Sequence, residues 1–179
     1  SGRNRIELDN VLVGEVWVCS GQSNMEWPLR ASFQAESDTA NSSNPSIRLF
    51  TVPKRKALAP MDDVVGSWQL CGPDTAPTFS AVAYYFGRAL QRDCRVPVGL
   101  INTSWGGSPA EVWMSGDTLA RDPEWNRDIL GAYSAARSAH ETALAAWQKE
   151  KAEADAAGRK FEKRRPGEPW RPSELYNGM

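Results

Sequence analysis

Two apolar stretches of the chain each end in a turn of small and polar residues, and this repeated arrangement restricts the fold more than any other feature. The stretch Val11–Cys19 is rich in β-branched residues and runs into the turn Ser20–Asn24. The stretch Val96–Ser104 is also nearly all apolar and runs into Trp105–Met114. Short apolar runs of this kind are typical of buried strands in a parallel sheet. The sequence therefore predicts two buried strands that end in glycine-bearing turns.

The segments between these two stretches indicate the same class of fold. Ser46–Val52 and Val64–Cys71 are predicted to be strands. In Pro77–Asp93 apolar residues recur at helical spacing, and Thr78 or Ser80 can cap the start of the helix. A strand, a crossover helix and another strand are typical of an α/β fold, in which a parallel sheet carries helices on its faces.

The character of the chain changes at Asp122. The segment that follows is rich in Ala, Glu, Lys and Arg, which predicts a long helix or a helical hairpin broken near Gly158. The simplest interpretation is a solvated helical insertion. From Arg164 to Met179 the chain returns to an irregular sequence with several prolines.

Charge and composition exclude several classes of function. The formal net charge is −1, so the chain has no basic surface for nucleic acid and no polybasic patch for a membrane. No apolar stretch approaches the roughly 20 residues of a membrane-spanning helix, so no membrane insertion is expected. No metal site and no cofactor are predicted, because the three cysteines lack the spacing of metal ligands.

The cysteines and tryptophans allow further expectations. Cys19 is expected to be a small buried hydrophobe within its strand. A disulfide between Cys71 and Cys94 is one alternative for the other two cysteines. The eight tryptophans can either pack in the core or offer flat platforms for sugar rings, and the core is the commoner place for any one of them.

Ser23 lies where chemistry is expected in such a fold. In open α/β sheets the reactive groups lie at the carboxyl ends of the strands. The Ser23 hydroxyl would project from a tight strand-to-helix turn, and nearby backbone N–H groups would favour a developing negative charge. Two interpretations remain open on the local sequence: a catalytic nucleophile, or a serine that only caps the helix.

Three separated motifs resemble one family. The strings GEVWVCSGQSNMEWPL, VGLINTSWGGSPAEVWMS and PSELYNGM together resemble the sialate O-acetylesterases, carbohydrate acetylesterases of the SGNH-hydrolase superfamily. The resemblance implies a three-layer α/β/α fold with a parallel sheet, of which this chain would carry only the N-terminal part. It also implies hydrolysis of O-acetyl esters on sugars, and a secreted, periplasmic or lysosomal location.

The resemblance assigns roles to individual residues of the two turns. Ser23 matches the nucleophile, and its own backbone N–H would be one donor to the oxyanion. Gly106 matches the glycine whose backbone N–H is a second donor, and a glycine there would let the ester approach closely. Glu111 would either line the pocket or anchor the second loop. The candidates for the substrate pocket are Gln22, Asn24, Trp27, Trp105, Gly107 and Glu111.

The chain departs from the family pattern in its base. A serine nucleophile needs a base, usually a histidine oriented by a carboxylate, and the family carries both in an Asp-x-x-His motif. The one histidine here, His140, follows Arg137 rather than an aspartate at that offset, so we do not expect it to be the base. The family's Gly-Glu-Ser-Asn stretch is also absent from this sequence. We therefore expect a second polypeptide or chain segment to supply the Asp-x-x-His.

These expectations divide the chain into four parts. Residues 1–10 would end a preceding β-rich domain, 11–118 would form the N-terminal part of the esterase domain, 119–172 the helical insertion, and 173–179 the return to the esterase domain. The substrate would be an O-acetylated carbohydrate, either a sialic acid or a plant polysaccharide such as xylan. The alternatives are a non-catalytic carbohydrate-binding module and a lipase-like esterase, the latter disfavoured because no apolar lid-like segment is present.

Overall fold

The computed structural model describes residues 4–179, which fall into two compact units. The first unit takes in the chain through Lys54, then Asp62–Gly107 and Met179. The second unit is made of Arg55–Met61 and Ser108–Gly178. Both predicted turns, up to Gly107, belong to the first unit.

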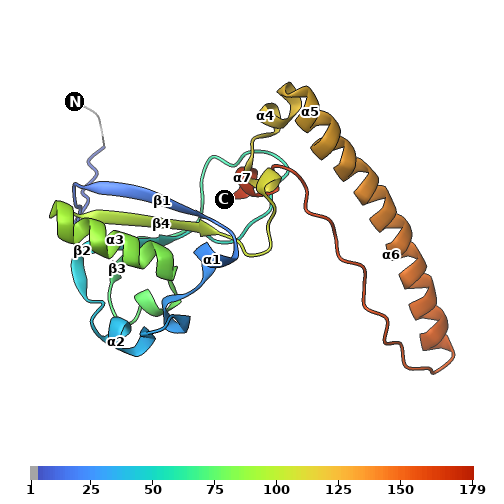
Figure 1. Ribbon diagram of the computed structural model, residues 1–179, viewed down its shortest axis with the longest axis horizontal. Coiled ribbons are helices and arrows are strands. Elements are labelled where there is room, and N and C mark those ends of the chain that lie inside the picture. The colour runs from blue at the N-terminus through green and yellow to red at the C-terminus, as the bar shows by residue number, and fades with distance from the viewer. Residues whose placement is uncertain (1–3) are drawn as a thin grey trace. The chain divides into compact units, whose positions relative to one another are not determined.

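The first unit is built on a mostly parallel sheet (Figure 1). Within the described residues its strand order is β1-β4-β2-β3. Strand β4 pairs in parallel with both β1 and β2, and β3 runs antiparallel to β2. The predicted α/β fold with a parallel sheet is therefore confirmed, with the difference that β3 runs antiparallel to its neighbour. The strands are β1 (Glu15–Gly21), β2 (Asn44–Thr51), β3 (Gln69–Cys71) and β4 (Val98–Ser104).

Strand β1 starts later than the sequence predicts and lies at the edge of the sheet. Its ladder with β4 begins at the pair Glu15 and Val98, so residues 11–14 lie outside it. In the described part of the chain β1 pairs only with β4, and Val16 and Val18 remain 60% and 66% exposed. The prediction of a buried strand was thus wrong here, because an apolar, β-branched composition does not distinguish a central strand from an edge strand.

Helix α3 (Ala81–Cys94) packs against β4 and β2 and closes the core of this unit. Ser80 caps it, since its hydroxyl oxygen accepts the Ala83 N–H at 3.1 Å, which agrees with one of the two predicted caps. A turn of 3-10 helix, η2 (Ala76–Thr78), precedes it. The buried core includes Cys19, Leu29, Ile47, Leu49, Phe79, Tyr84, Val98 and Leu100.

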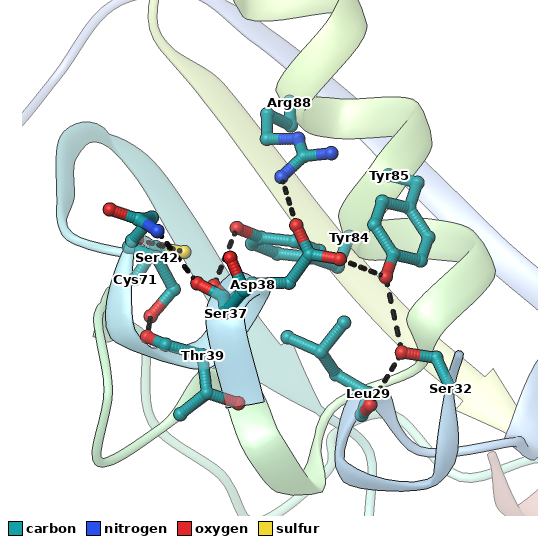
Figure 2. Close-up of polar contacts among 11 residues, drawn as sticks. Leu29, Ser32, Ser37, Asp38, Thr39, Ser42, Cys71, Tyr84, Tyr85 and Arg88 are labelled. Atoms are coloured by element: carbon teal, nitrogen blue, oxygen red, sulfur yellow. Dashed lines mark hydrogen bonds and ion pairs between the residues drawn. The ribbon is translucent and has the colours of Figure 1, made fainter. Parts of the chain in front are cut away.

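Three short helices connect β1 to β2, and a polar cluster fastens one of them to α3. Asp38 accepts hydrogen bonds from the Tyr85 hydroxyl at 2.6 Å and from Arg88 at 2.8 Å. The Tyr85 hydroxyl also lies 3.1 Å from the Ser32 Oγ, and the Arg88 guanidinium lies over the Tyr84 ring (Figure 2). The connecting helices are α1 (Ser23–Glu26), η1 (Leu29–Ala31) and α2 (Ala35–Ala40).

The second unit is mainly helical, and its longest element agrees with the predicted long helix. The helix α6 (Ala132–Ala156) is followed by Gly158, whose φ of +63° is typical of a helix end. The hairpin alternative was wrong, because residues 159–171 form no second helix. The other elements are η3 (Ala110–Trp113), α4 (Gly116–Arg121), α5 (Pro123–Trp125), the π-helical turn η4 (Asn126–Gly131) and α7 (Glu174–Gly178).

The cysteines and tryptophans correct two expectations. Cys71 and Cys94 do not form a disulfide: Cys71 is buried and its thiol donates to the Ser42 carbonyl, whereas Cys94 is exposed. Cys19 is buried, as expected. None of the eight tryptophans is fully buried. Within residues 4–179 no helix is both long and apolar enough to cross a membrane.

Candidate active site

The two glycine-bearing turns lie together because β1 and β4 pair in register to their ends. The last pair of the ladder is Gly21 and Ser104, and the Trp105 N–H extends it by donating to the Gly21 carbonyl at 3.0 Å. Ser23 and Gly106 thus each lie two residues beyond the same pair. A β-carbon placed on Gly106 would lie 3.6 Å from the Ser23 Oγ. The serine hydroxyl and the glycine therefore face each other.

Gln22 links the serine to the second turn through one amide oxygen. The Gln22 Oε1 accepts the Ser23 hydroxyl at 2.7 Å and the Ser23 backbone N–H at 3.0 Å. It also accepts the Gly107 N–H at 3.4 Å. Gly107 has a φ of +77°, a conformation that favours glycine. The Gln22 side chain therefore holds Ser23 and the Gly107 turn in a fixed relation.

A carboxylate holds the Gly106 backbone. The Gly106 N–H donates to the Glu26 Oε2, while the Lys54 ammonium pairs with the Glu26 Oε1. The Lys54 hydrogen bond lowers the pKa of the Glu26 carboxyl, and the Gly106 N–H contributes in the same direction. The Lys54 Nζ also lies 5.3 Å from the centre of the Trp105 ring. Glu26 is therefore a charged carboxylate at neutral pH that bridges the turn and the lysine.

These groups open onto a pocket of about 610 Å³ in the first unit. Its wall includes Trp27, which is 55% exposed and whose indole N–H donates to the Ala31 carbonyl. Its floor includes the buried Asn102 and Ser104, joined by a hydrogen bond of 2.7 Å. Two cations and one carboxylate line the pocket, namely Arg30, Lys54 and Glu26. This volume is within the usual range of small-molecule binding pockets.

The structure brings most of the predicted site residues together. Gln22, Ser23, Gly106 and Gly107 are linked by the contacts described above, and Trp27 lines the pocket. Trp105 lies beside Lys54 in the first unit and is partly buried.

Two candidates are not among the residues that form these contacts or line the pocket. Asn24 is exposed on α1 and is not among the residues that line the pocket. Glu111 belongs to η3 of the second unit, where its backbone carbonyl accepts the Ser173 N–H at 3.0 Å.

Sequence reasoning missed Glu26, Lys54 and Arg30. Glu26 is separated from Lys54 by 28 positions and from Gly106 by 80, so no local pattern connects them. One signal was available: Glu26 follows Ser23 by three positions, which places both on the same side of a helical turn. Lys54 comes three residues after the end of β2, at the carboxyl ends of the parallel strands, where the two turns also lie.

Among the described residues the Ser23 hydroxyl donates to the Gln22 Oε1 and to no histidine. His140 lies on α6, and its Nδ1 is buried without a hydrogen-bond partner. Arg137, three residues before it, pairs with Glu141 instead. Residues 4–179 contain no cluster of three or more side chains that could hold a metal ion.

Comparison with known proteins supports a single family. The family described as "Carbohydrate esterase, sialic acid-specific acetylesterase" matches residues 13–158. The sialate O-acetylesterase of Rattus norvegicus is 40% identical over 121 residues, which cover 62% of this chain and 22% of the rat protein. The sialate O-acetylesterase of Homo sapiens is 36% identical over 123 residues, covering 64% of this chain and 24% of the human protein.

A solved structure gives the same result. The crystal structure of a carbohydrate acetylesterase from Xanthomonas citri superposes with a TM-score of 0.59 at 37% identity, over 60% of this chain and 25% of that one. The chain thus spans about a quarter of the length of these relatives. Because the family match includes both turns and most of the chain, this protein belongs to the carbohydrate esterase family of sialic acid-specific acetylesterases.

Proposed function

We propose that this chain carries the serine nucleophile of a carbohydrate O-acetylesterase. The observation that carries the proposal is the juxtaposition of the Ser23 hydroxyl and Gly106 at the ends of two paired strands, above a pocket of about 610 Å³. The names of the relatives in rat, human and Xanthomonas citri support the same reaction class.

The reaction we propose is an acetyl transfer in two steps. The Ser23 Oγ attacks the acetyl carbonyl carbon, the bond to the sugar oxygen breaks, and a base carries the serine proton to the departing sugar hydroxyl. Water then attacks the acetyl-serine and releases acetate. In each step the negative carbonyl oxygen needs hydrogen-bond donors. The Ser23 and Gly106 backbone N–H groups are our candidates for this oxyanion hole.

The base is proposed to come from outside residues 1–179. The sequence contains no Asp-x-x-His, and His140 has no carboxylate partner among the described residues. A second polypeptide or chain segment with that motif would complete the proton transfer. We also propose that 119–172 forms an insertion in the esterase domain and that 173–179 returns to it, with 1–10 ending a β-rich domain.

The pocket favours an acetylated sugar acid among the candidate substrates. Arg30 is exposed at the pocket wall, where its guanidinium could bind a carboxylate on the sugar. The exposed face of Trp27 can stack on a sugar ring. A sialic acid carries such a carboxylate, whereas xylan substituted only with acetyl groups is neutral.

The test uses the complete enzyme that contains this chain. Ser23→Ala should reduce release of acetate from an aryl acetate by about 10³-fold or more. A fluorophosphonate should add its mass to the peptide that contains Ser23. The control is Ser37→Ala, on an exposed serine of α2, which should keep the wild-type rate. If Ser23→Ala hydrolyses the ester at the wild-type rate, the proposal is wrong and a non-catalytic binding role is favoured.

A further inference from the structure

The backbone donor assigned to the oxyanion hole is already in use. The Gly106 N–H points at the Glu26 Oε2, and a β-carbon on Gly106 would lie 2.8 Å from that oxygen. One N–H cannot form a full-strength bond to a carboxylate and to an ester oxygen at once. The Glu26 carboxylate therefore occupies the position that the substrate's carbonyl oxygen needs.

From this arrangement we propose that Glu26 is a gating residue that masks the Gly106 donor until the ester displaces it, with Lys54 balancing the charge of the Glu26 carboxylate. The inference rests on the proposed function of Ser23 and Gly106. Glu26 is an anion, so it imitates the charge of the intermediate that the site stabilises. Its second oxygen is bound by Lys54, and the two side chains are each between a third and a half exposed, so the contact can open to solvent.

Displacement has a cost that depends on the charge of Glu26. A carboxylate accepts a hydrogen bond about twice as strongly as a neutral amide does. The ion pair with Lys54 adds the modest stabilisation of a partly exposed pair. The apparent affinity for the ester is the intrinsic affinity multiplied by the fraction of molecules in which the Gly106 N–H is free, so the mask lowers it. The mask therefore raises KM, while at saturating ester it has been displaced and affects kcat little.

Lys54 acts on the intermediate more than on the mask, because a partly exposed ion pair stabilises the mask only modestly. Its ammonium balances the Glu26 charge beside the position where the oxyanion forms. If Lys54 is removed, Glu26 can still accept from Gly106, but its negative charge is then uncompensated next to a second developing negative charge. This change should disfavour the intermediate. We therefore expect substitutions of Glu26 and of Lys54 to change kcat/KM in opposite directions.

The experiment compares Glu26→Gln and Lys54→Met in the complete enzyme, with a neutral aryl acetate as substrate. Glu26→Gln should raise kcat/KM about three- to tenfold, mainly through a lower KM. Lys54→Met should lower kcat/KM by about the same factor. Glu36→Gln, a carboxylate-to-amide change on α2 outside the pocket lining, is the matched control and should leave both constants unchanged.

A binding measurement gives an independent readout. An arylboronic acid forms a tetrahedral anionic adduct with a serine hydroxyl, and its affinity should rise in Glu26→Gln by the same factor as kcat/KM. If both variants lower kcat/KM, or if Glu26→Gln lowers kcat with KM unchanged, Glu26 supports the turn and does not mask it. Ser23→Ala tests the nucleophile separately. Once that variant has abolished activity, the outcomes above concern only the role of Glu26.

Discussion

Gly106 presents its backbone to Ser23 so closely that a β-carbon on the glycine would lie 3.6 Å from the serine Oγ and 3.5 Å from its Cα. A β-carbon there would be in ordinary van der Waals contact with the serine, so the further atoms of a larger side chain would crowd the Ser23 hydroxyl. This relation leads to the first prediction.

Gly106→Val should impair catalysis more than folding. The valine branches would fill the space in front of the Ser23 hydroxyl, and the ester could no longer approach the Gly106 N–H. We expect kcat to fall by about 10²-fold or more, the scale of a lost oxyanion donor. The urea midpoint of the variant should stay near that of the wild type. Near-normal turnover would show that the glycine serves only the turn.

Gly87→Ala should destabilise the protein although the residue lies inside a helix. A β-carbon there would lie 2.5 Å from a Leu100 methyl in the core, and such overpacking costs about 1–3 kcal/mol. This exceeds the gain of up to about 1 kcal/mol that alanine brings to a helix. Gly131→Ala is the matched control: its β-carbon meets no atom closer than 3.8 Å, so only the gain should remain. Urea unfolding of both variants measures the difference.

Asp38→Asn should loosen α2 from α3. The Tyr85 hydroxyl bond and the Arg88 ion pair lower the pKa of the Asp38 carboxyl, so the folded state favours the charged form. Loss of the Asp38 charge should lower the unfolding free energy by about 1–2 kcal/mol. The effect is no larger because Arg88 is partly exposed. The control Glu36→Gln, on the same helix, should change the unfolding free energy by less than about 0.5 kcal/mol, as is usual for exposed positions.

The same contact predicts a pH dependence. Because folding lowers the Asp38 pKa below its ordinary value of 3.8, its stabilisation is present above that pH and is lost as the pH falls through the folded pKa. The difference in unfolding free energy between wild type and Asp38→Asn should therefore shrink as the pH is lowered below about 4. A difference that grows on acidification would contradict this assignment.

The three cysteines should react with a maleimide at very different rates. Burial raises the pKa of the Cys71 thiol to about 11, so at pH 8 roughly one molecule in a thousand carries the thiolate there. Cys19 is also buried, whereas Cys94 is exposed. Peptide mass spectrometry should find fast labelling at Cys94 and labelling of the other two only in denaturant. Protection of Cys94 that is lifted by a reductant would indicate a disulfide.

The strands and turns were predictable because their signals are local. The apolar runs that became β2 and β4 carry their own strand propensity, and Ser80 is a cap that accepts an N–H only three residues further along the chain. The edge position of β1 was not predictable in this way. It depends on which strand lies on its other side, and nothing inside residues Glu15–Gly21 encodes that.

The site was predictable only in part, for a related reason. Ser23 and Gly106 follow strands and belong to short recognisable motifs. The Glu26–Lys54 contact joins residues that are distant in sequence. It forms because β2 runs parallel to β4, so the carboxyl end of β2 lies on the same side of the sheet as the two turns. The tryptophans do not follow the expectation from their large apolar area, which favours the core, because none of the eight is fully buried.

The register of β1 against β4 sets the distance between Ser23 and Gly106, because each lies a fixed number of residues beyond the ladder. Ser23 and Gly106 each come two positions after the paired residues Gly21 and Ser104. A slip of one residue would shift one turn along the other by about 3.3 Å and turn its side chains to the opposite face. Loops elsewhere can therefore be lengthened without changing this relation, whereas an insertion between Gly21 and Ser23 would have to be matched by one between Ser104 and Gly106. The relation between Ser23 and Gly106 is thus a constraint on chain length as well as on residue type.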